Sequence, residues 1–371
     1  MATLLLAAGL LAGRARELGV PFEGVPGALN AITDVGGIEV GQVTLHSGEG
    51  RQAVRTGVTV VWPRGKKSFT PVFGGWFSLN GNGEMTGTTW VEEGGLLDGP
   101  VMITNTHSVG IVRDSFIKWQ VARMQAASGE PPDEWSLPVV AETWDGFLND
   151  VNGFHVKEAD VAAALEGAKP GPVAEGNVGG GTGMVCYGFK GGIGTASRRT
   201  GGYTVGVLVQ CNCGRRAQLR IAGAPVGQEI TDSVPYARHT RSGDEDVGSI
   251  IIVVATDAPL LPHQIKRLAR RASLGLARTG SISGNGSGDI FIAFSTANPQ
   301  AGQASGLVNV TMMANDDMNG LFEATVEATE EAIINAMVGA ETMTGFDGHT
   351  VIALPHDRLR TVLEKYNRLA K

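Results

Sequence analysis

Residues 238–255 read RHTRSGDEDVGSIIIVVA and contain the sharpest change of composition in the chain. Arg238–Gly248 has one apolar member, whereas Ser249–Ala255 is almost entirely apolar and rich in β-branched residues. Such an apolar run predicts a strand that is buried on both faces. A polar segment ahead of a buried strand is ordinarily a connection, and that interpretation stays open here. The alternative is a cut between Gly248 and Ser249, which would make Ser249 the first residue of a core strand.

A cut at this position would give Ser249 both a nucleophile and a base. A serine hydroxyl reacts poorly unless a neighbouring group takes its proton. A free α-amine has a pKa of about 7.7–8.0, close to working pH, and it would lie on the same residue. Glycine at position 248 permits the unusual backbone angles that self-attack on a peptide bond requires. The sequence therefore indicates an autocleavage site at Gly248–Ser249 and a candidate catalytic serine at its carboxyl side.

Composition and charge exclude several other classes of protein. Glycine supplies 54 of 371 residues, roughly double its usual share of about 7%, yet no Gly-x-y period of a collagen runs through the chain. A hydrophobic content of 42% is too high for a disordered protein. With 30 Lys and Arg against 37 Asp and Glu, the net charge of −7 argues against nucleic acid as the main partner.

Neither a membrane span nor a location follows from the sequence. No apolar run approaches the about 18 residues that a spanning helix needs. The stretch Leu4–Gly13 resembles the apolar region of a signal peptide, but no basic residue precedes it. A signal remnant and a packed or frayed end are both compatible with it, so the bacterial cytoplasm and the periplasm remain open.

Short apolar runs and a few helical patterns alternate along the chain. Strands are predicted at Val58–Trp62, Val101–Thr104 and Tyr203–Gln210, which are bounded by turn residues. Helices are predicted at Val156–Glu166, Leu260–Thr279 and Phe322–Val338. The last of these is expected to turn four acidic side chains to solvent: Glu323, Glu327, Glu330 and Glu331.

Cofactor motifs are missing from the sequence. The seven histidines show no zinc-binding spacing; they are His46, His107, His155, His239, His263, His349 and His356. The glycine-rich stretch Gly176–Gly194 lacks the pattern of a phosphate-binding loop. Three cysteines, Cys186, Cys211 and Cys213, are too few for a four-thiolate site and are interpreted as buried apolar residues without a disulfide framework. We therefore expect no metal and no organic cofactor.

Several long strings resemble one enzyme family. They include Gly75–Gly87 (GWFSLNGNGEMTG), Thr104–Asp114 (TNTHSVGIVRD), Gly176–Ser197 (GNVGGGTGMVCYGFKGGIGTAS), Gly248–Leu261 (GSIIIVVATDAPLL) and Thr279–Asp289 (TGSISGNGSGD). From about residue 14 to its end, the chain is similar to the DmpA/BapA family of L-aminopeptidase D-Ala-esterase/amidases and β-peptidyl aminopeptidases.

The resemblance implies a fold and a processing event. The fold is a four-layer α-β-β-α sandwich, as in the N-terminal-nucleophile hydrolases. Residues 1–371 would form a single domain that cleaves itself into chains 1–248 and 249–371, which stay associated. Assembly into homotetramers of the cleaved chains is also implied.

The resemblance further implies roles for individual residues. Ser249 is the nucleophile, Ser287 and Asp289 orient it, and Asn212 lines the oxyanion hole. Because alternate residues of an extended segment point to one side, Ser287 and Asp289 are expected to face one pocket. An aminopeptidase also needs a carboxylate for the substrate amine. For this substrate-binding role the candidates are Glu142, with Trp144 and Phe147 as apolar walls.

The expected activity is a self-processing serine aminopeptidase or amidase that acts on short peptides, amides or esters with a free amino terminus. Two alternatives remain at this point. One is an acyltransferase of the ornithine acetyltransferase type, which shares the architecture. The other is an uncleaved, non-enzymatic binding module. The choice among L-α-, D-α- and β-aminoacyl substrates also stays open, because one methylene changes discrimination by only about 1–3 kcal/mol.

Overall fold

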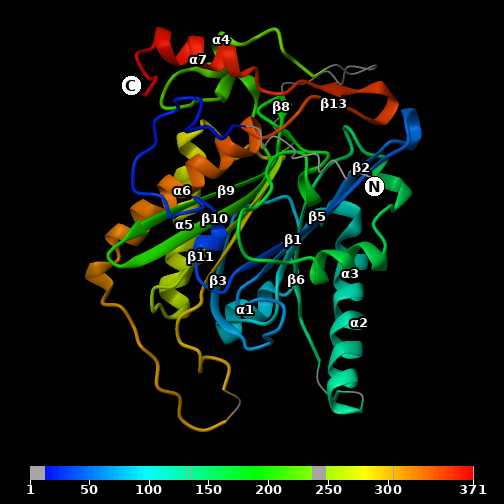
Figure 1. The fold of residues 1–371 in the computed structure, drawn as a ribbon, viewed down its shortest axis with the longest axis vertical. Coiled ribbons are helices and arrows are strands. Elements are labelled where there is room, and N and C mark those ends of the chain that lie inside the picture. The colour runs from blue at the N-terminus through cyan, green and yellow to red at the C-terminus, as the bar shows by residue number, and fades with distance from the viewer. Residues whose placement is uncertain (1–12, 131, 134, 236–247, 304, 371) are drawn as a thin grey trace, which may run out of the picture.

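Two β-sheets are packed face to face between two pairs of helices (Figure 1). The structure is a computed structural model and describes residues 13–130, 132–133, 135–235, 248–303 and 305–370. Most of the polar segment before Gly248 and nearly all of the apolar amino-terminal stretch lie outside these ranges. Within them, no helix is both long and apolar enough to cross a membrane.

The smaller sheet has the strand order β1-β2-β5-β6. Its strands are β1 (Glu39–Ser47), β2 (Val54–Trp62), β5 (Val101–Asn105) and β6 (Val139–Thr143). Helices α2 (Val109–Ser128) and α3 (Glu158–Glu166) cover its outer face. The cluster under these helices consists of alternate strand residues such as Val58, Val60 and Trp62, packed on Phe116 and Leu165.

The larger sheet has the order β4-β3-β12-β11-β10-β9. Its strands are β3 (Val72–Gly81), β4 (Leu96–Leu97), β9 (Gly192–Thr200), β10 (Tyr203–Asn212), β11 (Ser249–Thr256) and β12 (Gly288–Ser295). Helices α5 (Pro262–Arg278) and α6 (Asn319–Val338) cover its outer face. Strand β11 lies in the middle, antiparallel to β10 and parallel to β12.

The remaining elements are short and lie around the sandwich. They are α1 (Thr88–Gly94), α4 (Val226–Glu229), α7 (His356–Lys365) and two small hairpins, β7 (Val185–Cys186) with β8 (Phe189–Lys190) and β13 (Met343–Thr344) with β14 (Thr350–Val351).

The two-sided burial predicted for the run after Gly248 is confirmed. Ile250 and Ile252 of β11 pack under α5 and α6, whereas Ile251 and Val253 pack between the sheets. All eight residues of the strand are buried. Each face is apolar because helices cover one side and a second sheet covers the other. The α-β-β-α class expected from the sequence is therefore confirmed.

Two expectations from the sequence are wrong. Glu331 does not face solvent: it is fully buried and accepts hydrogen bonds from Arg16 at 2.8 Å, while Arg198 lies 2.7 Å away. A buried carboxylate is tolerated because two guanidinium groups compensate its charge. Paired in this way, Glu331 has a pKa below its usual value, although burial opposes that shift.

The second correction concerns the cysteines. Cys186 and Cys211 form a disulfide, with their Cα atoms 5.8 Å apart, and Cys213 Sγ lies 3.9 Å from Cys211 Sγ. An odd number of cysteines does not prevent one pair, and hairpin β7–β8 brings Cys186 beside β10, within bridging distance. The three sulfur atoms lie within 4.8 Å of one another, but two of them are bonded together, so the cluster offers no set of thiolates to a metal.

Candidate active site

Ser249 lies at the point where three neighbouring strands begin or end. It is the first residue of β11 and is paired with Asn212, the last residue of β10, and with Gly288, the first residue of β12. These pairings bring together residues that are 37 and 39 positions apart in sequence. Their chemistry is therefore placed by sheet register, which a rigid core holds in place.

The hydroxyl of Ser249 contacts the peptide bond that precedes it. Ser249 Oγ donates a hydrogen bond to the carbonyl oxygen of Gly248 at 2.7 Å. The backbone N–H of Gly288 points at the same two groups, 3.1 Å from Gly248 O and 3.3 Å from Ser249 Oγ. A backbone donor in this place can stabilise negative charge on that carbonyl oxygen, as the donors of an oxyanion hole do.

Gly248 is fitted tightly against strand β10. A Cβ atom at this position would lie 2.4 Å from Asn212 O and 2.6 Å from Cys213 Cα. Both contacts are with backbone, which cannot turn aside as a flexible side chain would. Glycine is thus required at position 248 for close approach.

Ser287 and Asp289 share one side of the chain, as the alternation in an extended segment predicts. Ser287 Oγ donates to Asp289 Oδ1 at 2.8 Å, and both residues are almost completely buried. They flank Gly288, whose N–H faces the Gly248–Ser249 bond. The S-G-D sequence therefore places a buried hydroxyl–carboxylate pair next to the serine.

The side-chain amide of Asn212 is held at both ends. Asn212 Oδ1 accepts from the Val185 N–H at 2.7 Å, and Asn212 Nδ2 donates to the Trp144 carbonyl at 2.9 Å. An amide nitrogen carries two N–H groups, so the bond to Trp144 uses one of them. Exchanging the oxygen and nitrogen would put an N–H against an N–H and a carbonyl against a carbonyl, so the two contacts fix the orientation of the amide.

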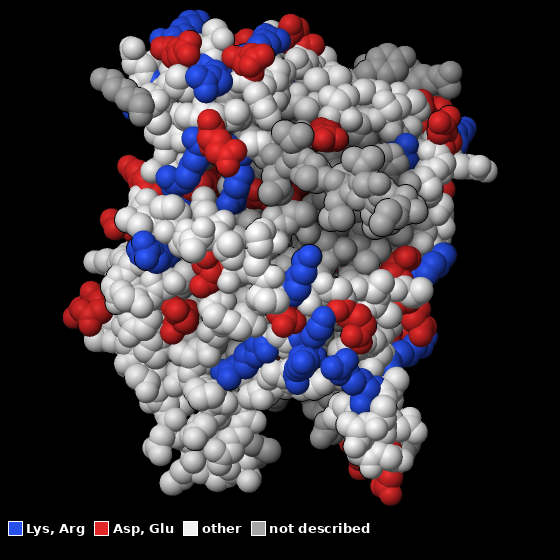
Figure 2. All heavy atoms as spheres, in the orientation of Figure 1, with Lys and Arg blue, Asp and Glu red and all other residues white. Residues whose placement is uncertain are grey.

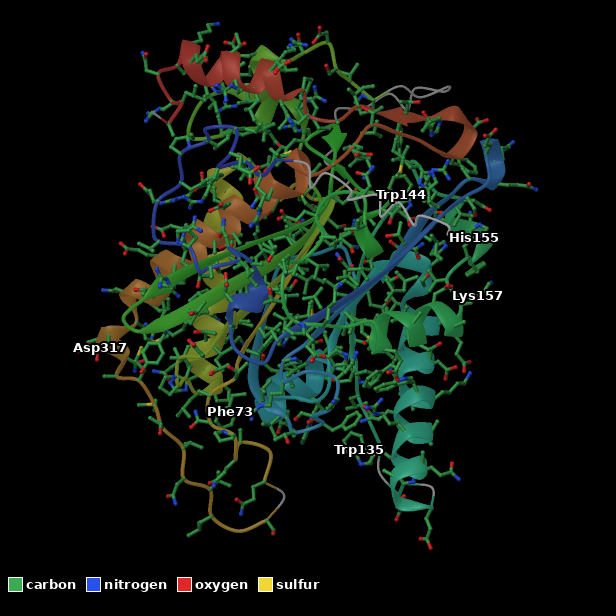
Figure 3. All side chains as sticks on the ribbon, viewed as in Figure 1. Phe73, Trp135, Trp144, His155, Lys157 and Asp317 are labelled. Carbon is green, nitrogen blue, oxygen red and sulfur yellow. A yellow bond between two sulfur atoms is a disulfide. The ribbon has the colours of Figure 1, made fainter. Side chains whose placement is uncertain are left out.

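Ser249 lines a cavity of about 490 Å³. The cavity is lined by Asn82, Gly83, Glu84, Thr106, Glu142, Trp144, Gly248, Ser249 and Gly286. Two of these residues are glutamates, and the described lining includes no lysine or arginine. Trp144, labelled in Figure 3 near the upper end of the sheets, contributes the large apolar surface. Such a lining suits a small ligand that carries a positive charge.

Glu142 is the buried acid of this cavity. Only 4% of the residue is exposed, and it lies on β6. Burial raises the pKa of its carboxyl, although hydrogen bonds from the Thr106 hydroxyl and the Glu84 N–H act in the opposite direction. The carboxylate is thus fixed in orientation at the wall of the cavity that contains Ser249.

Phe147 lies outside the set of residues that line the cavity. Its ring stacks on His349 with centroids 4.6 Å apart, next to the small cluster of Leu148, Met343 and Val351. The turn that starts at Asp145 carries it there. Conversely, no local pattern marks Asn82, Glu84 or Thr106 for a role, although the strings Gly75–Gly87 and Thr104–Asp114 that contain them carry the family resemblance.

The fold and the comparisons with known proteins define a hydrolase of the aminopeptidase type. The sequence model of peptidase family S58 matches residues 30–351, and the chain belongs to this family. It acts on peptide or amide substrates. Membership favours the aminopeptidase interpretation over the acyltransferase and binding-module alternatives.

Two curated relatives cover nearly the whole chain. The chain is 55% identical to the β-peptidyl aminopeptidase BapA of Sphingosinicella microcystinivorans, over 99% of this chain and 97% of the relative. It is 48% identical to the enzyme of the same name from Sphingosinicella xenopeptidilytica, over 96% and 92% of the two chains.

Solved structures show the same likeness. The L-aminopeptidase D-Ala-esterase/amidase of Ochrobactrum anthropi, described as a variant of the Ntn hydrolase fold, superposes with a TM-score of 0.89 and 50% identity over 96% of this chain and 99% of its own. A Burkholderia sp. β-aminopeptidase gives a TM-score of 0.85 and 48% identity over 95% and 99%.

Proposed function

We propose that the chain cleaves itself between Gly248 and Ser249 and then uses Ser249 as an amino-terminal nucleophile. The hydroxyl of Ser249 attacks the Gly248 carbonyl, the C–N bond breaks, and water hydrolyses the resulting ester. The products are a carboxylate on Gly248 and a free α-amine on Ser249. Chains 1–248 and 249–371 remain one folded unit, because β11 lies between strands of both chains.

In turnover, the α-amine of Ser249 takes the proton of its own hydroxyl as Oγ attacks the substrate carbonyl. The same proton passes to the leaving amine or alcohol, which departs and leaves an acyl-enzyme. Water then attacks the acyl group and restores the serine. Gly288 N–H and the second N–H of Asn212 stabilise the oxyanion, and Ser287 and Asp289 orient the amino-terminal serine.

Glu142 and Glu84 give the cavity its preference for a substrate with a free, positively charged amino terminus. A carboxylate close to a cationic amine stabilises it strongly in a partly buried site. We infer short peptides, amides or esters as substrates, and the names of the Sphingosinicella relatives favour β-aminoacyl groups among them. A panel of p-nitroanilides of L-Ala, D-Ala and β-homoamino acids would separate the L-α, D-α and β preferences.

We also propose that cleaved heterodimers assemble, with a homotetramer as the expected state. Several large apolar side chains are exposed, among them Leu307 at 97% and Trp135 at 73%. Leu307 belongs to the long connection that extends from the lower end of the molecule after β12 (Figure 1). Light scattering coupled to size exclusion would measure the assembly.

One observation carries the proposal: the first residue of a buried central strand is a serine whose hydroxyl touches the preceding carbonyl inside an acidic cavity. Ser249→Ala should stay a single chain and lose all activity, whereas Ser273→Ala, on the exposed face of α5, should be cleaved and active. Denaturing electrophoresis and p-nitroanilide hydrolysis measure both. An uncleaved Ser249→Ala protein that still turns over substrate would refute the assignment.

A further inference from the structure

Lys190 is a completely buried lysine that the proposed chemistry does not use. It lies on β8, and its Nζ donates to the carbonyl oxygens of Met184 at 2.7 Å and Gly191 at 2.8 Å, with Gly181 O at 3.5 Å. Burial lowers the pKa of Lys190 to about 7, while attraction to Asp145 acts in the opposite direction. Fully buried lysines are rare, and a nitrogen donating to several carbonyls fixes the loop to which they belong.

That loop contacts the candidate oxyanion residue directly. Met184, whose carbonyl Lys190 holds, immediately precedes Val185, and the Val185 N–H donates to Asn212 Oδ1 at 2.7 Å. The carbonyl of Met184 and the N–H of Val185 belong to the same peptide unit. Because a peptide unit is planar and stiff, fixing one of these groups fixes the other.

A second buried ionisable side chain, that of Asp145, lies next to the other hydrogen bond of the Asn212 amide. Asp145 directly follows Trp144, whose carbonyl accepts from Asn212 Nδ2 at 2.9 Å. The Asp145 carboxylate accepts from Asn105 Nδ2 at 3.0 Å and Asn149 Nδ2 at 3.1 Å. Asp145 is fully buried, and these bonds hold the start of the turn that follows β6.

Lys190 and Asp145 both contact the same loop. A Cβ atom on Gly183 would lie 2.8 Å from Asp145 Cβ, so the loop packs against Asp145 while its carbonyls accept from Lys190. Both hydrogen bonds of the Asn212 amide therefore end on backbone groups that are anchored next to a buried ionisable side chain.

We propose that Lys190 and Asp145 are positioning residues that hold the Asn212 amide in its catalytic orientation. The inference rests on the oxyanion role proposed for Asn212. An oxyanion donor works because it is aligned before the reaction begins, and a displacement of about 1 Å can cost about a hundredfold in rate. Loss of either Lys190 or Asp145 should thus lower kcat, because the Asn212 amide loses its alignment, with little change in substrate binding.

A double-mutant cycle tests this coupling. Lys190→Met keeps an unbranched side chain, one heavy atom shorter, but removes the donors. It should lower kcat by about tenfold to about a hundredfold with KM changed by less than about twofold. In an Asn212→Ala background the same substitution should cost almost nothing more. Lys66→Met is the matched control, since Lys66 also donates to two carbonyls, those of Glu166 and Ala168, on the outer face at α3; its kcat should equal that of the wild type.

Rates are counted per cleaved chain, and thermal unfolding shows whether each variant is folded. If Lys190→Met does not accumulate as folded protein, Asp145→Asn enters the same cycle and is expected to show the same lack of additivity. If the substitution lowers kcat equally in the presence and absence of Asn212, or does not lower it at all, the positioning role is overturned. The oxyanion role proposed for Asn212 would be unaffected by that result. If Asn212→Ala itself leaves kcat unchanged, the proposed oxyanion role fails and the inference fails with it.

Discussion

The reactivity of Ser249 depends on the groups that lie within hydrogen-bonding distance of its hydroxyl. The serine hydroxyl touches Gly248 O at 2.7 Å, and Gly288 N–H lies 3.3 Å from that hydroxyl. The hydroxyl, the carbonyl and a donor for developing charge are thus already assembled around one peptide bond. Cleavage would add a base, the α-amine of Ser249, to this set of groups.

Asp289 is expected to act through its charge. Asp289→Asn keeps the shape of the side chain but removes the negative charge beside the amino-terminal serine, so kcat should fall by more than about tenfold. Asp257→Asn provides the control, because Asp257 follows the opposite end of β11, where it accepts from the Thr204 N–H. Steady-state hydrolysis of a p-nitroanilide measures both variants; an unchanged rate for Asp289→Asn would remove the residue from the site.

The sequence offered candidates for the reaction centre more readily than for the residues that support them. Ser249 is marked by a polar-to-apolar junction, and the roles expected of Ser287 and Asp289 come from the family resemblance of the S-G-D segment before a strand. Lys190 and Asp145 carry no such pattern, because their role depends on contacts between segments that only the folded chain brings together. Phe147 was expected beside Trp144 because they are near in sequence, but a turn separates them.

At the scale of elements, three strand ends assemble the site. Strands β10, β11 and β12 place Asn212, Ser249 and Gly288 side by side in register. A shift by one residue would turn each side chain to the opposite face of the sheet. Side-chain packing on both buried faces of β11, against the helices on one side and the second sheet on the other, opposes such a shift, so core packing also fixes the geometry of the site.

Gly248→Ala should slow self-cleavage strongly. Its methyl group would meet the backbone of Asn212 and Cys213 at 2.4 and 2.6 Å, which forces the scissile carbonyl away from Gly288 N–H. Gly110→Ala, in helix α2, is the control, since a Cβ there meets nothing within 4 Å. The time course of chain separation on a denaturing gel measures both. Cleavage of Gly248→Ala at the wild-type rate would contradict the close fit described above.

The turn after β6 gives a prediction about stability and pH. Burial raises the pKa of Asp145 to about 6 from an ordinary 3.8. The folded state therefore binds this proton more tightly than the unfolded state. The stabilising contribution is complete below the unfolded pKa and is lost as pH rises through about 6.

Asp145→Asn should remove this dependence on pH. The free energy of unfolding of the wild type minus that of Asp145→Asn should fall by about 2 kcal/mol between about pH 4.5 and about pH 7.5. Urea unfolding in a Ser249→Ala background, which keeps the chain whole, measures the difference. A difference that is constant over this range would contradict the raised pKa of the buried carboxyl.

Several of the larger elements, but not α2, could be predicted from periodicity. The strand that follows Gly248 and the helices α3, α5 and α6 lie within a few residues of their predicted bounds, because apolar faces and glycine stop signals define them. The burial of Glu331 could not be predicted, since a glutamate on a helix is normally solvated. Only the approach of Arg16 and Arg198, which are distant in sequence, makes its burial tolerable.

In the whole molecule, the apolar core that stabilises the fold and the cavity proposed for the reaction lie in different places. Three apolar clusters lie in the spaces between the four layers, and the active-site cavity opens at one end of the sheets. On the face shown in Figure 2, Lys and Arg side chains lie among Asp and Glu side chains. The acidic character proposed to select the substrate is thus local, carried by Glu142 and Glu84 in the cavity.

The state of one peptide bond in the active protein decides whether this mechanism operates. Intact-mass spectrometry of purified, active protein, with labelling of free amino termini, measures it directly. We predict two chains, one ending at Gly248 and one beginning with an unblocked Ser249, and a loss of activity when that amine is acylated. Full activity in material that consists of a single chain, with Gly248 still joined to Ser249, would contradict it.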